Sequence, residues 1–116
     1  MSKLTDQLRA EGADMDGAMD RLCGDEELFA SCFTYFLSDP AFSALSAAID
    51  AGDAAAAFES AHALKGVAGN LGLTDVYDLC GALVEPLRGG GPVTEPLHQA
   101  LQALLARRDA LRALDA

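Results

Sequence analysis

A histidine on the outer face of an alanine-rich helix is the residue of this sequence best suited to chemistry. Helical spacing puts Ala55, Glu59, His62, Gly66 and Gly69 on one face. The opposite, apolar face holds Ala54, Ala57, Phe58, Ala61, Leu64, Ala68 and Leu71. A neutral imidazole that points outward is an accessible nucleophile. Because a glycine inside a helix costs about 1 kcal/mol relative to alanine, the two glycines beyond His62 indicate that something approaches closely there.

The residues around His62 resemble the signature of a known family. Residues 60–72 read SAHALKGVAGNLG, which closely resembles the A-H-x-L-K-G motif, small residues and hydrophobic-Gly pair of the histidine-containing phosphotransfer (HPt) domain. Residues 18–28 and Phe33 also look like the N-terminal region of that family. The resemblance implies a phosphorelay intermediate in two-component signal transduction. In this role His62 accepts a phosphoryl group from an aspartyl phosphate on a response-regulator receiver domain and passes it to another receiver.

Four neighbours of His62 are expected to share in the site. Lys65, three residues on, is a helical neighbour whose ammonium can offset the charge of a phosphoryl group on the ring. Gly66, four residues on, lets the cleft of the receiver close over the imidazole, and Gly69 extends that clearance. Glu59, on the same face one turn earlier, is counted among the binding residues. The expected partners are receiver domains and a hybrid sensor kinase.

Each of these residues also has a purely structural interpretation. A single histidine on a helix is usually a solvated or capping residue, and Lys65 can be a solvated charge. Gly66 and Gly69 can serve close packing inside the protein. The second hypothesis is therefore a non-catalytic helical adaptor that docks a regulator or kinase without phosphotransfer. The exposed imidazole with a lysine and glycines around it favours phosphotransfer, since an adaptor has little reason to retain that set.

Other candidate motifs carry less chemistry. His98 has no acidic or thiol partner at ligand spacing, which favours a surface or boundary residue. Residues 89–91 are three glycines without the Lys-Ser/Thr of a Walker motif, which predicts a loop. The sequence also lacks a kinase Gly-rich loop and a carboxylate cluster, so no kinase activity with ATP and no bound cofactor or metal are expected. By resemblance, the Mg²⁺ and the acceptor aspartate belong to the receiver.

Composition restricts the classes of partner. The chain has 116 residues, of which 51% are hydrophobic, and a formal net charge of −10. This acidic balance opposes binding to nucleic acid or to an anionic membrane, so that a protein partner is expected. Without a secretory signal or a long apolar run, the chain is expected to be cytoplasmic, and a monomer is the simplest state. The cysteines lack disulfide or zinc spacing and are interpreted as reduced thiols, mostly core filler: Cys23, Cys32 and Cys80.

Capping and stop signals divide the chain into helices. The predicted ranges are about 3–10, 16–22, 26–37, 40–51, 54 to 70 or 71, 75 to 83 or 85, and 94–114. The predicted N-caps are Asp25, Ser38 or Asp39, Asp53 and Thr74, and the predicted stop signals are Gly12, Gly24, Gly52 and Gly72. Pro86 is expected to end or kink its helix near Glu85, because proline lacks an amide hydrogen and clashes with the preceding turn. Residues 87–93 are expected to form a flexible loop.

Several helices joined by short turns, with no competing strand pattern, predict an all-α fold. The expected architecture is an antiparallel up-and-down four-helix bundle in a single domain of residues 1–116. The short N-terminal helices are expected to pack across one end. The resemblance adds that the histidine lies midway along the second long helix of this bundle and is exposed on its flank.

Overall fold

The computed structural model describes the backbone of residues 3–115 and the side chains of residues 3–114. Within that range the chain forms α-helices and no strand, which confirms the predicted all-α class. None of these helices is both long enough and apolar enough to cross a membrane. The helices are α1 (Lys3–Ala10), α2 (Met15–Arg21), α3 (Glu26–Leu37), α4 (Pro40–Ala51), α5 (Ala54–Asn70), α6 (Thr74–Leu87) and α7 (Glu95–Asp115).

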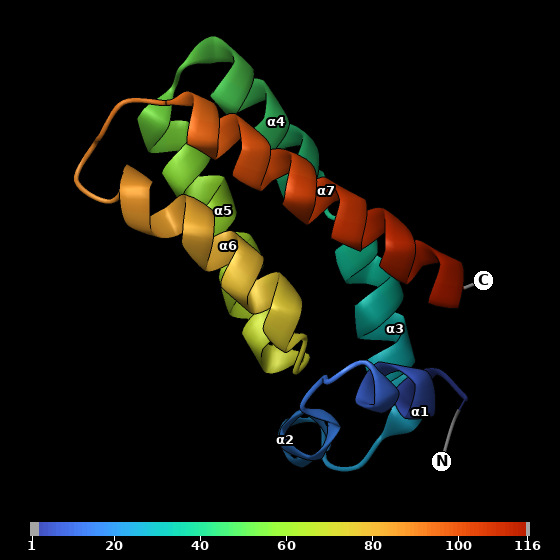
Figure 1. The fold of residues 1–116 in the computed structure, drawn as a ribbon. Helices are drawn as coiled ribbons and strands as arrows, with labels where there is room; N and C mark the ends of the chain where they lie inside the picture. The colour runs from blue at the N-terminus through green and yellow to red at the C-terminus, as the bar shows by residue number, and fades with distance from the viewer. Residues whose placement is uncertain (1–2, 116) are drawn as a thin grey trace.

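The longer helices pack side by side, and α1 and α2 lie at one end of them (Figure 1). Helix α5 packs against α4 on one side and α6 on the other, α6 packs against α7, and α7 returns to α3 and α4. Figure 1 shows α3 and α4 following one another along the length of α7. The buried side chains between the helices include Phe29, Phe33, Phe42, Leu45, Leu64, Leu83 and Leu104. With neighbours on two sides, α5 keeps one face toward the outside.

Aspartate caps set where the helices before and at the histidine begin. Asp39 accepts a hydrogen bond from the Ala41 amide at 2.8 Å, and Asp53 accepts one from the Ala56 amide at 3.1 Å. Between them, Gly52 ends α4 with a φ of 71°, in the left-handed region that favours glycine. The predicted caps Asp25, Asp39 and Asp53 are thereby confirmed. Because the turn is so short, the start of α5 and the direction of each of its side chains are closely defined.

The predicted starts of α2, α6 and α7 each differ from the structure by one residue, and α7 begins at Glu95, one residue after its predicted start. Helix α2 begins at Met15 because the Asp14 side chain accepts a hydrogen bond from the Gly17 amide at 3.0 Å, one residue before the predicted start. Helix α6 begins at Thr74 itself, with Leu73 at the N-cap. The prediction that Thr74 caps this helix is wrong, since its hydroxyl instead donates to the carbonyl oxygen of Gly12 at 3.1 Å. The threonine thus fastens α6 to the N-terminal segment.

Of the two effects predicted for Pro86, an end or a kink of the helix near Glu85, the end is wrong. Helix α6 continues to Leu87, and the Arg88 amide donates to the Val84 carbonyl at 2.9 Å beyond the proline. Pro86 lies in the last turn, where the missing amide removes only one hydrogen bond. Leu87 is 1% exposed, and burying a leucine stabilises by roughly 1.5–3 kcal/mol, which offsets that loss. The extra residues bring Arg88 alongside α5.

The N-terminal helices attach to the end of α5 through backbone groups. The Asp14 amide donates to the Gly72 carbonyl at 2.8 Å. The Arg21 guanidinium donates to the carbonyl oxygens of Asn70 and Gly69, both at 2.9 Å. These carbonyls lie at the C-terminus of α5, where the last carbonyl groups of a helix lack the amide partners of a regular turn. The contacts hold α2 against the turn between α5 and α6.

Candidate functional site

His62 projects from the exposed face of α5, as predicted. Its ring stacks on the ring of Phe58, with centroids 5.6 Å apart and an angle of 10° between the planes. Phe58, predicted on the apolar face, is half-buried and covers one face of the imidazole. An aromatic residue four positions before a histidine in a helix is the signal that can reveal such a neighbour. His62 remains exposed although it stacks on Phe58.

Arg88, the residue that follows α6, brings a cation to the same cluster. Its guanidinium carbon lies 5.7 Å from the centroid of the Phe58 ring, and its Nη2 atom lies 3.3 Å from Glu85 Oε1. The Phe58 ring therefore contacts both His62 and Arg88. The sequence predicts Arg88 in a flexible loop and does not mark it as a site residue. Only the packing of α6 along α5 brings it here.

Lys65 lies on the side of α5 that faces α6. Its Nζ atom lies over the face of the Tyr77 ring, 5.0 Å from the ring centroid. Tyr77 belongs to α6, and Gly81 follows it one turn later. A methyl group at Gly81 would lie 3.9 Å from Lys65 Cε, in ordinary contact, so this position borders the lysine stem. The sequence does not identify Tyr77 as a neighbour of the site.

The two glycines of the outer face have different surroundings. A methyl group added at Gly66 would meet no neighbouring atom within 4 Å among the described residues, so there is open space beside His62. At Gly69 the same methyl group would lie 3.3 Å and 3.4 Å from two carbons of the Tyr77 ring. The space at Gly69 is thus already filled by this chain. The clearance predicted at Gly69 serves Tyr77, while the open space at Gly66 fits approach by a partner.

The remaining candidate residues from the sequence are Glu59 and His98. Glu59 is exposed on α5 one turn before His62. His98 is half-buried on α7, as expected for a boundary residue. In the described part of the chain, no group of three or more His, Cys, Asp or Glu side chains is arranged to hold a metal ion.

The cysteines differ in their surroundings. Cys80 is fully buried on α6, and burial raises the pKa of its thiol to about 12 although the nearby Lys65 charge lowers it in part. This thiol stays protonated at neutral pH and acts as core filler, as predicted. Cys32 is half-buried. Cys23 is exposed with a φ of 57° in the turn before α3, and is therefore an exception to the prediction that the cysteines are mostly core filler.

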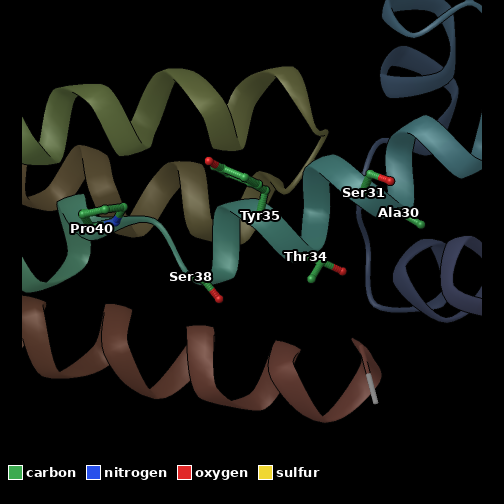
Figure 2. A pocket seen from close by; sticks show the side chains of 6 residues that line it. All are labelled: Ala30, Ser31, Thr34, Tyr35, Ser38 and Pro40. Carbon is green, nitrogen blue, oxygen red and sulfur yellow. The ribbon is translucent and has the colours of Figure 1, made fainter.

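An open hollow of about 670 Å³ lies along α3 and the start of α4 (Figure 2). Its lining residues are Ala30, Ser31, Thr34, Tyr35, Ser38 and Pro40. Tyr35 is 80% exposed and stands out from α3. All of these residues belong to α3, α4 or the turn between them, whereas His62 and its neighbours belong to α5 and α6. The hollow therefore adds no group to the histidine site.

Comparison with known families identifies the class of protein. The family model of the Hpt domain matches residues 38–111, a range that contains the whole histidine site and covers well over half of the chain. The chain therefore belongs to the Hpt domain family. Hpt domains carry out histidine phosphotransfer in two-component signalling and interact with receiver domains and kinases. Neither a curated protein nor a solved structure matches the chain.

Proposed function

We propose that this protein is a phosphorelay intermediate in which His62 accepts a phosphoryl group from the aspartyl phosphate of one receiver domain and passes it to another. The observation that carries the proposal is the exposed imidazole of His62 beside the open space at Gly66. Both residues lie inside the range that matches the Hpt family model. An exposed ring nitrogen and free space next to it are the two features that in-line attack on a partner's phosphate requires.

The chemical step uses few groups of this chain. The unprotonated ring nitrogen of His62 attacks the phosphorus, the N–P bond forms, and the P–O bond to the aspartyl carboxyl breaks. The carboxylate of the receiver leaves with the electron pair, and the other ring nitrogen keeps its proton. Transfer to the next receiver reverses these changes with a new carboxylate as acceptor. By resemblance to the family, the receiver would hold the Mg²⁺, which would assist phosphoryl transfer by neutralising charge on the phosphoryl group.

The wider assignment follows the same proposal. The protein acts as a cytoplasmic monomer, with residues 1–116 as one domain, and a hybrid sensor kinase and receiver domains as its partners. Its architecture is an up-and-down four-helix bundle in which α3 and α4 together take the place of one long helix. The position of α3 and α4 one after the other along α7 in Figure 1 supports this architecture.

Incubation with a phosphorylated receiver domain tests the proposal against the adaptor hypothesis. We expect this protein to acquire a phosphate that is labile in acid and stable in base, as phosphohistidine is. Binding of the receiver without transfer of the label would instead support an adaptor.

Replacing Lys65 with alanine is expected to slow transfer or shorten the phosphohistidine lifetime by about tenfold or more. The variant loses one charge-assisted contact to the phosphoryl group, which contributes about 1.5–3 kcal/mol when partly desolvated. The rate of transfer from one phosphorylated receiver measures the first effect, and the rate at which label is lost from this protein measures the second. Lys65→Arg, which keeps the positive charge, is the matched control. Unchanged kinetics in Lys65→Ala would make this residue a solvated charge without a phosphate role.

Replacing Gly66 with glutamine is expected to separate stability from transfer. The helix should become more stable by up to about 1 kcal/mol, because glycine is unfavourable inside a helix. Transfer should nevertheless fall about tenfold or more, since the new side chain projects into the space that the receiver must occupy. A thermal melt and transfer rates from one receiver measure both effects.

Gly66→Ala is the control for this experiment. It gives a similar gain in helix stability but adds only a methyl group to the open space, so most of the transfer activity should remain. If Gly66→Gln lowers stability and its folded fraction transfers normally, the glycine serves packing inside the protein instead.

A further inference from the structure

The imidazole and the ammonium of the site lean in opposite directions along α5. His62 stacks on Phe58, which lies one turn toward the N-terminus of the helix. Lys65 instead places its Nζ atom over Tyr77, the ring that covers Gly69, one turn toward the C-terminus from the lysine. Long side chains of a helix usually point back toward its N-terminus, which here would bring Lys65 toward His62. In the structure the ammonium of Lys65 thus contacts Tyr77, whereas the imidazole of His62 contacts Phe58.

Gly69 lets the Tyr77 ring pack closely against α5, and Gly81 borders the Lys65 side chain. The edge of the Tyr77 ring lies so close to Gly69 that a side chain there would meet it at 3.3 Å. On α6, Gly81 borders the Lys65 stem, where an added methyl group would already be in contact with Cε at 3.9 Å. Tyr77 is 41% exposed, so its ring is a large apolar surface that the fold leaves partly open to water. A cation over the face of such a ring is attracted by its negative quadrupole.

We propose that Tyr77 is a positioning residue that holds Lys65 away from His62 in the unphosphorylated protein and releases it to the phosphoryl group after transfer. The inference rests on the proposed function of His62. Lys65 then has two mutually exclusive positions, one on the Tyr77 ring and one at the phosphoryl group. Tyr77 stabilises only the first, so that it weakens the preference of the protein for the phosphorylated state.

This arrangement has a defined thermodynamic consequence. A contact that is present only in the unphosphorylated state lowers the equilibrium constant for phosphorylation by the full strength of that contact. For a cation over an aromatic ring at a partly exposed site, this corresponds to about two- to fivefold. The result is a phosphohistidine that passes its phosphoryl group on to the next receiver more readily than it would without the tyrosine.

The test is the equilibrium of phosphoryl transfer between this protein and one receiver domain loaded with acetyl phosphate, approached from both directions. Tyr77→Leu keeps an apolar side chain but removes the ring, and it should shift the equilibrium about two- to fivefold toward phosphohistidine. Tyr77→Phe keeps the ring face and should restore the wild-type equilibrium. Docking contacts cancel in an equilibrium between the free proteins, so a role of Tyr77 in docking alone would change the rates and leave this constant unchanged.

Two controls assign the effect to the lysine. In a Lys65→Met background, Tyr77→Leu should cause no further shift, because the cation that it releases is gone. Tyr35→Leu, at an exposed tyrosine on α3, should leave the equilibrium unchanged. An unchanged equilibrium in Tyr77→Leu, or a shift away from phosphohistidine, would overturn the proposal, and the latter would mean that the ring supports Lys65 in the phosphorylated state.

Nuclear magnetic resonance separates this proposal from that for His62. In the unphosphorylated protein, the Tyr77 ring should shield the ε-methylene protons of Lys65, and Tyr77→Leu should abolish the upfield shift. Phosphorylation of His62 should reduce it as well. If His62 is phosphorylated normally and the Lys65 protons stay shielded, the proposed role of Tyr77 is overturned while that of His62 stands. Failure of His62 to accept the phosphoryl group, with shielding intact, would overturn the proposed function and with it the release step.

Discussion

Replacing His62 with glutamine is expected to abolish phosphoryl acceptance and to leave the fold intact. The glutamine amide has no nucleophilic nitrogen lone pair, so the N–P bond cannot form. The side chain is exposed and contacts the half-buried Phe58 ring, so the free energy of unfolding should change by less than about 1 kcal/mol. Transfer of label from a phosphorylated receiver measures the first effect, and circular dichroism with a thermal melt measures the second.

His98→Gln is the matched control for this substitution. His98 is half-buried on α7 and has no expected chemical role, so this variant should accept the phosphoryl group at the wild-type rate. If His62→Gln is labelled as fast as the wild-type protein, the assignment of the phosphorylated residue is wrong. Loss of label in His98→Gln with normal acceptance in His62→Gln would move the site to α7.

Replacing Gly72 with alanine is expected to destabilise the protein by about 3 kcal/mol or more. Gly72 has a φ of 71°, and a methyl group there would lie 2.2 Å from the backbone oxygen of Asp14. Relief requires the two backbones to separate, which breaks the 2.8 Å hydrogen bond from the Asp14 amide to the Gly72 carbonyl. Chemical denaturation measures the loss in the free energy of unfolding.

Gly52→Ala isolates the contribution of the backbone conformation. Gly52 has the same φ of 71°, but a methyl group there would meet no described atom within 4 Å. Its substitution should therefore cost only the left-handed conformation, about 1–2 kcal/mol. Equal losses in the two variants would show that contact between α2 and the α5–α6 turn contributes little to stability.

Local rules were sufficient for most of the helices. The predicted ranges of α1, α3, α4 and α5 agree with the structure, because aspartate caps and left-handed glycines act within one turn of the chain. The errors at Thr74 and Pro86 have tertiary causes. The Thr74 hydroxyl bonds to Gly12 in a distant part of the sequence, and burial of Leu87 in the core carries α6 past the proline.

The outward direction of His62 also follows from local rules. The buried side chains of α5 are Ala57, Ala61, Leu64 and Ala68, all of them on the predicted apolar face. Since helical periodicity relates every side chain of α5 to these four, the exposure of His62 and Gly66 can be derived without knowledge of any other helix. By the same rule, Gly69 belongs to the outer face, yet the Tyr77 ring covers it.

The sequence alone therefore determined most of the helix boundaries, the outward position of His62 and the open glycine beside it, since these depend on neighbours three or four residues apart. Tertiary structure decided which groups surround the imidazole and the ammonium. Arg88 contacts Phe58, and Tyr77 contacts Lys65, because α6 packs against α5 at one particular rotation and axial offset. That relation depends on how the side chains of two helices fit together over their whole contact, and no short segment of either helix contains it.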